Sequence, residues 1–153
     1  MKIATDNNFI TPGSLEISDW RALKVNGEQT KVIDFLQGQL TSDINLLDDN
    51  NLQLSCICDH KGQVVADFIA LKQDNDFFII IHKDLVTIFQ NELEVFAKFG
   101  SVIFEISDYK IIGEINKKGG SGHFFHSNDD FELSICLKKP DFENKNTINI
   151  DIW

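Results

Sequence analysis

The sequence predicts an α+β protein in which an antiparallel sheet carries two helices. Several short segments alternate apolar and polar residues, which is typical of strands, whereas residues 30–40 and 83–99 repeat apolar residues at helical spacing. From Trp20 to Ile106 the order is strand, helix, strands, helix, strand. That order matches a ferredoxin-like split βαβ sandwich, an antiparallel sheet with two helices on one face.

The first elements follow from local pattern and turn residues. "DWRALKVNG" is expected to be a strand that ends at an Asn-Gly turn, and a helix is expected over residues 30–40. "LQLSCICD" alternates, so its residues divide between two faces. One face is predicted to carry Leu52, Leu54, Cys56 and Cys58, and the other Gln53, Ser55 and Asp59.

The remaining elements of this region continue the same alternation. A turn at residues 59–62 leads into the strand "QVVADFIALK", and a turn at 73–76 leads into the strand "FFIIIH". The helix over 83–99 is expected to stop at Gly100. "SVIFEISD" and "YKIIGEI" return to strand character.

The pattern divides the chain into three parts. Residues 1–14 are predicted to be a lead-in segment, residues 15–112 a first domain, and residues 113–153 a partial, mostly β second lobe. In that lobe "HFFHS", "FELSICLKK" and "TINIDIW" are expected to be short strands. Because the chain stops at Trp153 within a strand pattern, we expect it to be truncated, either as the N-terminal fragment of a longer protein or as a shortened form of one.

Composition and charge exclude several function classes. The chain is 42% hydrophobic and 25% charged, an ordinary globular composition. A formal net charge of −10 argues against direct nucleic-acid binding, because phosphate affinity comes mainly from Lys and Arg. No apolar run approaches the ~20 residues of a membrane span, and the start lacks a secretory signal. With three cysteines, an odd number, we expect a cytoplasmic protein with reduced thiols and no membrane contact.

Asp67 is the most informative single position. It lies in "VVADFIAL" with apolar residues on both sides in the sequence, so either face of the strand is expected to be covered. A buried carboxylate without partners is costly, which predicts a specific donor such as an arginine, backbone amides or the N–H groups of a ligand. The alternative is a bulge or edge position at which Asp67 reaches water.

Cysteines and histidines offer weaker signals for a metal site. Cys56, Cys58 and His60 share one strand side at i, i+2 and i+4, but parallel side chains do not converge on one ion as a zinc knuckle does. We therefore expect Cys56, Cys58 and Cys136 to pack in the core and His60 to lie in an exposed turn.

Two further motifs carry no metal or phosphate prediction. "KKGGSGH" resembles a phosphate-binding loop in composition only, and a surface hairpin loop is the expected structure. His123 and His126 flank two phenylalanines, but no third ligand is identifiable near them. No metal ligand is predicted.

Four stretches together resemble a known family. "DWRALKVNG", "FLQGQLTSDI", "CDHKGQVVADF" and the helix ending in "FAKFG" look like the N-terminal portion of YgfZ-type folate-binding proteins. These proteins are relatives of the aminomethyltransferase T-protein of the glycine cleavage system. The similarity runs from about Leu15 to Gly113 and is loose beyond that.

The resemblance implies a three-domain protein whose central channel binds tetrahydrofolate. In the T-protein relatives a strand aspartate contacts the pterin, and Asp67 matches that position, so the resemblance assigns it the folate contact. Gln37, Gly38, Gln39 and Thr41 are implied as channel-lining residues, and Thr41 or Asp43 would also cap the next turn. At Gly38 a glycine would permit a left-handed residue and close backbone approach, the alternative being plain helix termination.

The implied function is that of a folate-binding accessory protein of iron–sulfur protein synthesis or repair, and thereby of tRNA modification. Its partners would be a reduced folate and iron–sulfur client enzymes. The family's later K-G-C-Y-x-G-Q-E motif has no counterpart in this sequence. Aminomethyl or one-carbon transfer is one alternative, for which no catalytic residue is identified, and a non-catalytic protein-interaction module is another.

Overall fold

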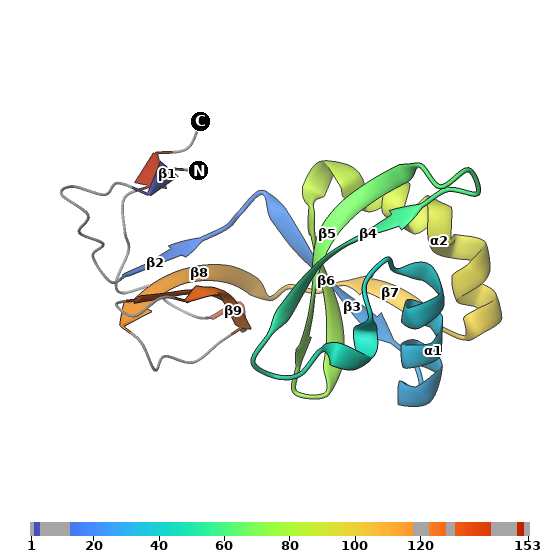
Figure 1. Ribbon diagram of the computed structural model, residues 1–153, viewed down its shortest axis with the longest axis horizontal. Coiled ribbons are helices and arrows are strands. Elements are labelled where there is room, and N and C mark those ends of the chain that lie inside the picture. The colour runs from blue at the N-terminus through green and yellow to red at the C-terminus, as the bar shows by residue number, and fades with distance from the viewer. Residues whose placement is uncertain (1, 4–12, 118–122, 128–130, 142–149, 152–153) are drawn as a thin grey trace. The chain divides into compact units, whose positions relative to one another are not determined.

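The computed structural model describes residues 2–3, 13–117, 123–127, 131–141 and 150–151. The chain forms two compact units, one of residues 19–107 and one that combines residues 1–18 with 108–153 (Figure 1). These units do not follow the domain boundaries predicted at residues 15 and 112. The reason is that β2 (Gly13–Glu16) pairs with β8 (Lys110–Lys117), a long-range pairing that no local pattern reveals.

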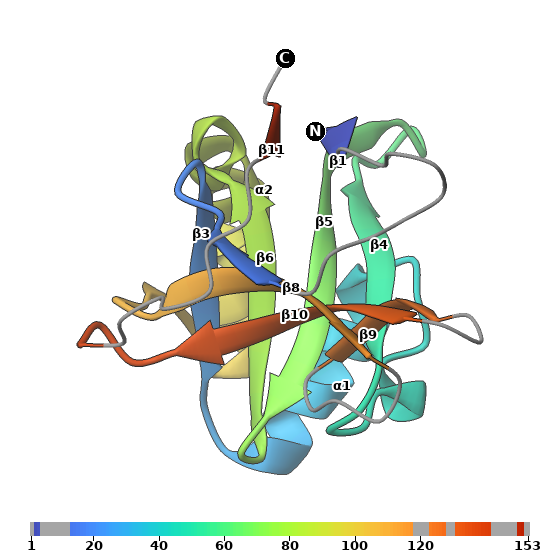
Figure 2. The ribbon, with the colours of Figure 1, turned by 90° about the vertical axis from the view of Figure 1, so that its left-hand side faces the viewer.

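The unit of residues 19–107 is a five-stranded antiparallel sheet with two helices. Its strand order is β4-β5-β6-β3-β7, and Figure 2 shows the first four of these strands side by side. The strands are β3 (Trp20–Asn26), β4 (Leu52–Cys58), β5 (Val64–Gln73), β6 (Asp76–His82) and β7 (Ile103–Ile106). The helices are α1 (Gln29–Gln39) and α2 (Val86–Gly100), with the short 3₁₀ turns η1 (Ile44–Leu46) and η2 (Lys83–Leu85).

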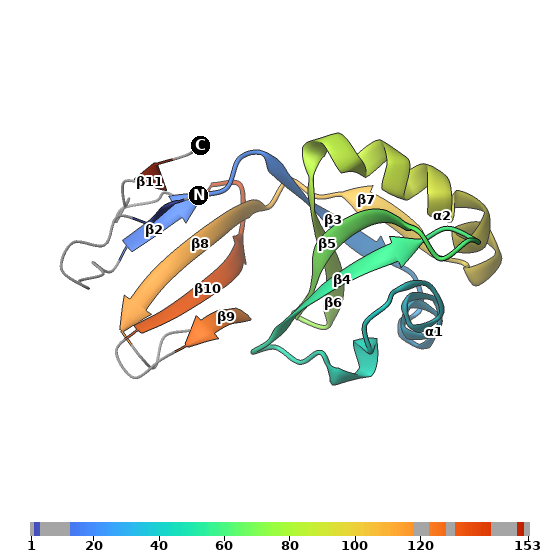
Figure 3. The same cartoon turned by 45° about the horizontal axis from the view of Figure 1, so that its top comes forward.

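Both helices lie on one face of this sheet (Figure 3). The predicted α+β class is confirmed, and each strand and helix expected between Trp20 and Ile106 is present. The sheet has five strands, and three of them follow α1 and precede α2 in the sequence. The ferredoxin-like description of this topology stays a prediction.

The face under the helices holds the core of this unit. Phe89 of α2 is fully buried, and its ring meets those of Phe68 and Phe104 edge-on at centroid distances of 5.3 and 5.1 Å. Edge-to-face contact is a favoured arrangement of aromatic rings. Alternate residues of the strands supply the rest of this layer, namely Leu23, Val25, Ile57, Ala66, Ala70, Phe77, Ile79 and Ile81.

The predicted stop of the second helix is correct in position but differs in mechanism. The helix ends at Gly100, and the left-handed residue is the following one, Ser101, with φ 57°. A Cβ at Gly100 would lie 3.0 Å from Cδ2 of Phe35. Glycine at this position therefore allows α2 to approach α1 closely.

The second unit is built from strands alone among its described residues. β9 (His123–Ser127) and β10 (Phe131–Lys138) extend a sheet of order β2-β8-β10-β9, and β1 (Lys2–Ile3) pairs with β11 (Ile150–Asp151). The mostly β prediction for this region is confirmed. The predicted lead-in, residues 1–14, contains β1 and the start of β2, and its other residues lie outside the described ranges.

Candidate functional site

Asp67 lies on the sheet face opposite the helices, which we call the second face. Its neighbours Ala66 and Phe68 point into the core, and side chains alternate along a strand, so the Asp67 carboxylate points away from the core. It is exposed, and among the described residues it has no hydrogen bond or ion pair. The expectation of a buried Asp67 is therefore wrong, because the apolar residues beside it in the sequence belong to the other face.

The exposure of Asp67 has a local explanation in the strand pairing. β5 lies between β4 and β6, but its pairing with β6 ends at Ile69 and Ile80, so at Asp67 the strand pairs with β4 alone and its other side is an edge. The register irregularity between β4 and β5 falls further along, at Ile57 and Cys58. Asp67 therefore reaches water at an edge position, the alternative that the sequence left open.

Thr41 and Cys56 line up with Asp67 across the sheet, and we call these three residues the Asp67 row. Cys56 is the cross-strand partner of Asp67. The Thr41 N–H donates to the Cys56 carbonyl oxygen at 3.1 Å, and the Cys56 N–H donates to Thr41 Oγ1 at 3.2 Å. Thr41 Oγ1 also lies 3.4 Å from Cys56 Sγ. Thr41 thus satisfies the backbone hydrogen bonds at the edge of β4 beside Cys56, which pairs with Asp67, the residue predicted to contact folate.

The other residues predicted to line a channel have local roles or no described contact. Gln37 is exposed, and its Oε1 accepts a hydrogen bond of 2.9 Å from the Ile44 N–H, which holds the turn after α1. Asp43 accepts from the Asn45 N–H at 3.1 Å, so the predicted capping role of Asp43 is confirmed. Gln39 is half-buried at the end of α1.

Gly38 does not have the conformation expected of it. It lies within α1, its φ is not positive, and a Cβ built there would meet nothing within 4 Å. Neither a left-handed residue nor a close approach to a described residue explains this glycine. The helix continues through Gly38 and ends at Gln39, and the turn that follows is held by Gln37 and Thr41.

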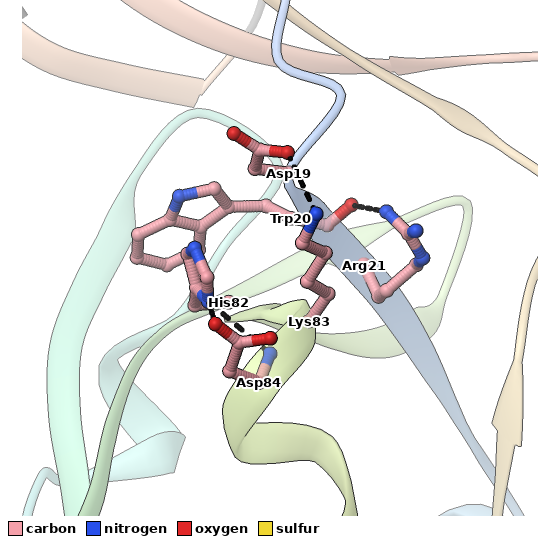
Figure 4. A network of polar contacts seen from close by, with 6 residues as sticks. All are labelled: Asp19, Trp20, Arg21, His82, Lys83 and Asp84. Atoms are coloured by element: carbon pink, nitrogen blue, oxygen red, sulfur yellow. Dashed lines mark hydrogen bonds and ion pairs between the residues drawn. The ribbon is translucent and has the colours of Figure 1, made fainter.

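Trp20 and His82 form a second cluster that sequence reasoning did not single out (Figure 4). They are opposite one another on β3 and β6, with ring centroids 6.0 Å apart in an edge-on contact. The Asp84 N–H donates to His82 Nδ1 at 3.2 Å, so the neutral imidazole carries its hydrogen on Nε2. Lys83 pairs with Asp19 at 3.2 Å and joins the start of β3 to the end of β6.

Asp67 and His82 lie at the same end of neighbouring strands. Ile69 of β5 and Ile80 of β6 are the last pair between these strands, and Asp67 and His82 each lie two positions beyond that pair on the same face, where β5 and β6 are no longer paired. Trp20 follows on β3. The second face therefore collects a carboxylate, an imidazole and an indole at one end of the sheet, three groups able to bind a polar aromatic ligand. The sequence signal for Trp20 and His82 was their position at the end of an apolar strand, whereas Asp67 lies within β5.

Of the three cysteines predicted to pack in the core, the structure buries one. Cys136 is buried in the second unit as expected, and burial together with Glu114 raises the pKa of its thiol to about 12. Cys56 and Cys58 are half-buried on the second face and are absent from the core, so their predicted core packing is wrong. His60 is exposed in the turn, as predicted.

The motif "CDHKG" has a structural explanation in this turn. Asp59 accepts from the N–H groups of Lys61 and Gln63 at 2.9 and 3.0 Å, and Gly62 has φ 80°. No group of three or more His, Cys, Asp or Glu side chains among the described residues could hold a metal ion. The loop of "KKGGSGH" and the side chains of His123 and His126 lie outside the described residues. Within the described part of the chain, no helix is long and apolar enough to cross a membrane.

Comparison with known proteins gives the following relatives. An uncharacterised protein of Haemophilus influenzae is 32% identical over 138 residues, which are 90% of this chain and 47% of that protein. The tRNA-modifying protein YgfZ of Colwellia psychrerythraea is 28% identical over 94 residues, 61% of this chain and 28% of the relative. An aminomethyltransferase of Caldanaerobacter subterraneus is 29% identical over 69 residues, 45% of this chain and 18% of the relative.

The chain is a distant homologue of the YgfZ tRNA-modifying proteins and of the aminomethyltransferases. It spans less than half the length of these relatives. The crystal structure of the aminomethyltransferase T of Bartonella henselae shares its fold, with a TM-score of 0.58 and 19% identity over 67% of this chain and 28% of that one. No family model matches the chain.

Proposed function

We propose that residues 15–112 provide one wall of a reduced-folate site, with Asp67 as the residue that contacts the pterin. The observation that carries this proposal is the exposed Asp67 carboxylate, which points away from the core and has no hydrogen bond or ion pair among the described residues. Homology to the YgfZ proteins and the aminomethyltransferases supports a folate as the ligand.

The chemistry of the ligand fits this carboxylate. A pterin ring presents neighbouring N–H groups along one edge, and a carboxylate accepts two parallel hydrogen bonds. Such charge-assisted bonds are stronger than neutral ones. Because no described residue donates to Asp67, a ligand would not have to displace a protein partner. On the same face of the sheet, the indole of Trp20 and the imidazole of His82 offer flat surfaces for an aromatic ring.

The wider role follows from the relatives. We propose a YgfZ-type accessory protein that binds tetrahydrofolate in the cytoplasm and supports the synthesis or repair of iron–sulfur proteins. The tRNA modification named for the YgfZ relatives would then be reached through iron–sulfur client enzymes. A net charge of −10 favours this indirect route over binding of tRNA by this chain.

A titration tests the ligand and the residue together. Tetrahydrofolate is added to the chain carrying Trp153→Phe, so that Trp20 is the remaining indole whose fluorescence reports binding. Asp67→Asn should weaken binding about 10- to 100-fold, because a hydrogen bond to a charged group is worth about 1.5–3 kcal/mol. Asp34→Asn, which alters an exposed carboxylate of α1, is the matched control and should leave the affinity unchanged.

Two results would contradict the proposal. Saturable binding that is equal in wild type and Asp67→Asn would remove the role of Asp67. Absence of binding at millimolar tetrahydrofolate would remove the site from this chain.

Aminomethyl or one-carbon transfer is the second candidate function. The similarity to an aminomethyltransferase favours it, and His82 is a titratable group at the same end of the sheet as Asp67. We expect no turnover with a methylene donor and tetrahydrofolate. Formation of methylenetetrahydrofolate that disappears in Asp67→Asn would favour this candidate.

A protein-interaction module is the third candidate. The outer side of α2 exposes the apolar side chains of Ile88, Val95, Phe96 and Phe99, the last 87% exposed. Apolar residues gathered on one helix face are characteristic of contact surfaces. Self-association in sedimentation that is abolished by Phe99→Ser and unaffected by folate would support this candidate.

A further inference from the structure

We propose that Cys56 and Cys58 form a redox-active dithiol that closes reversibly to an intramolecular disulfide by exchange with small-molecule disulfides. This inference is independent of folate binding. It rests on the placement of the two side chains on β4 and on their contact with one another.

The strand geometry brings the two thiols together. Residues i and i+2 of a strand point to the same side, so both sulfurs lie on the second face. Their Cα atoms are separated by two strand rises, about 6.6 Å, at the upper end of the range of roughly 4.4–6.8 Å found for disulfides. The register shift at this point places its extra residue, Val65, in β5, and Cys58 is the last residue of β4. Closure therefore requires the end of β4 to bring the two Cβ atoms within the roughly 3.5–4.5 Å of a disulfide.

The site is accessible to a small reagent. β4 is an edge strand, and Cys56 and Cys58 are both half-buried free cysteines. Cys136, the third cysteine, is buried in the other unit. The chain therefore contains an accessible pair and a protected single thiol.

The neighbouring Cys56 thiol also affects the ionisation of Cys58. Burial raises the pKa of Cys58, and so do the charge and hydrogen bond of the neighbouring Cys56 thiol and the charge of Asp59. Two thiolates side by side repel one another, whereas a sulfur–sulfur bond carries no charge. The raised pKa of Cys58 lowers its thiolate fraction near neutral pH, so closure should become faster as the pH rises.

The reaction is thiol–disulfide exchange with a low-molecular-mass disulfide as the oxidant. One cysteine thiolate attacks a sulfur of the reagent and forms a mixed disulfide, releasing the first reagent thiol. The other cysteine thiolate attacks the protein sulfur of that mixed disulfide and releases the second reagent thiol. In sum, two protein thiols are oxidised to one disulfide, the reagent disulfide is reduced to two thiols, and the cysteine protons end on those thiols.

The experiment uses the full chain and oxidised glutathione. The reduced protein is incubated with the reagent, quenched in acid, unfolded and alkylated, and its intact mass is measured. In the wild type we expect a mass lower by the two thiol hydrogens and alkylation of one cysteine. Trypsin should release residues 32–61, which contain both cysteines and no internal Lys or Arg, as the closed peptide.

Variants separate the pair from the single thiol. Cys136→Ser should still close, with no cysteine left to alkylate. Cys56→Ser and Cys58→Ser should each lose closure and accumulate one unresolved glutathione adduct. The wild-type peptide result does not depend on these variants, so it remains decisive if a serine variant fails to fold.

Some results would overturn the proposal. Wild-type protein carrying glutathione on Cys56 and Cys58 at the same time would show that the two sulfurs do not react with one another. A disulfide found only between two copies of the chain would do the same. Dithiothreitol should restore both thiols of the closed form, and failure to do so would contradict reversibility.

Discussion

The two faces of the five-stranded sheet carry different side chains, because successive residues of each strand point to opposite faces. The face under α1 and α2 receives aliphatic and aromatic side chains and buries them, as at Leu23, Ile79 and Phe89. The second face receives Asp67, Cys56 and Leu54, of which Leu54 is 69% exposed. The sequence of a strand does not determine which of its faces a helix will cover.

β4 illustrates the difference most clearly. Its sequence places four apolar or sulfur-containing residues on one side, and hydrophobicity alone would turn that side inward. The structure turns it to the second face and gives Ile57 and Ser55 to the helix side, where Ser55 accepts a hydrogen bond of 2.8 Å from Ser42. The face under the helices is largely apolar, whereas the second face is mixed: Leu71, Phe78 and Ile80 are buried on it, and Asp67 is exposed.

Truncation of the core should produce the largest effect. Phe89→Ala removes a fully buried ring that contacts two other rings, and should lower the free energy of unfolding by about 3–5 kcal/mol. Phe99→Ala, on the exposed side of the same helix, should change it by less than about 0.5 kcal/mol. Urea denaturation of both variants makes the measurement. Equal losses would show that the two sides of α2 are not distinct.

A smaller effect is expected at the edge of β4. Thr41→Ala leaves the Cys56 N–H without its acceptor and should lower the free energy of unfolding by about 1 kcal/mol. Thr41→Ser keeps the hydroxyl and should retain most of that stability. If alanine and serine behave alike in urea denaturation, the hydrogen bond to Cys56 does not stabilise the edge.

Gly38 should respond in the opposite direction. Gly38→Ala fills open space within α1 at an ordinary helical φ, and should raise the free energy of unfolding by about 0.5–1 kcal/mol. A rise in the unfolding midpoint combined with weaker tetrahydrofolate binding would indicate that this glycine serves the ligand. Lower stability would instead reveal a constraint at Gly38 within the chain itself.

The smallest effect is expected on the second face. Asp67→Thr replaces a poor strand former with a good one at an exposed position, and should raise the free energy of unfolding by about 0.5 kcal/mol. The same variant should abolish the folate affinity assigned to Asp67. Marked destabilisation would mean that Asp67 has a structural partner, and the two faces would then differ less than we infer.

The positions of the elements could be predicted from the sequence because their causes are local. The strand from Trp20, both helices and the turn at Asp59 follow from periodicity, turn residues and glycine placement. The capping role of Asp43 was equally accessible. The roles of Gln37 and Thr41 in holding the turn after α1 were not, because their partners Ile44 and Cys56 are brought near by the fold.

By itself the sequence determined the α+β class, the order of the elements and the kinship with YgfZ proteins, since these depend on patterns within short stretches. Only the tertiary structure decided that Asp67 is exposed, that Cys56 and Cys58 lie outside the core, and that Trp20 and His82 share their end of the sheet. The physical reason is that period-two alternation fixes which residues share a face. The covering of that face depends on helices that come from elsewhere in the chain.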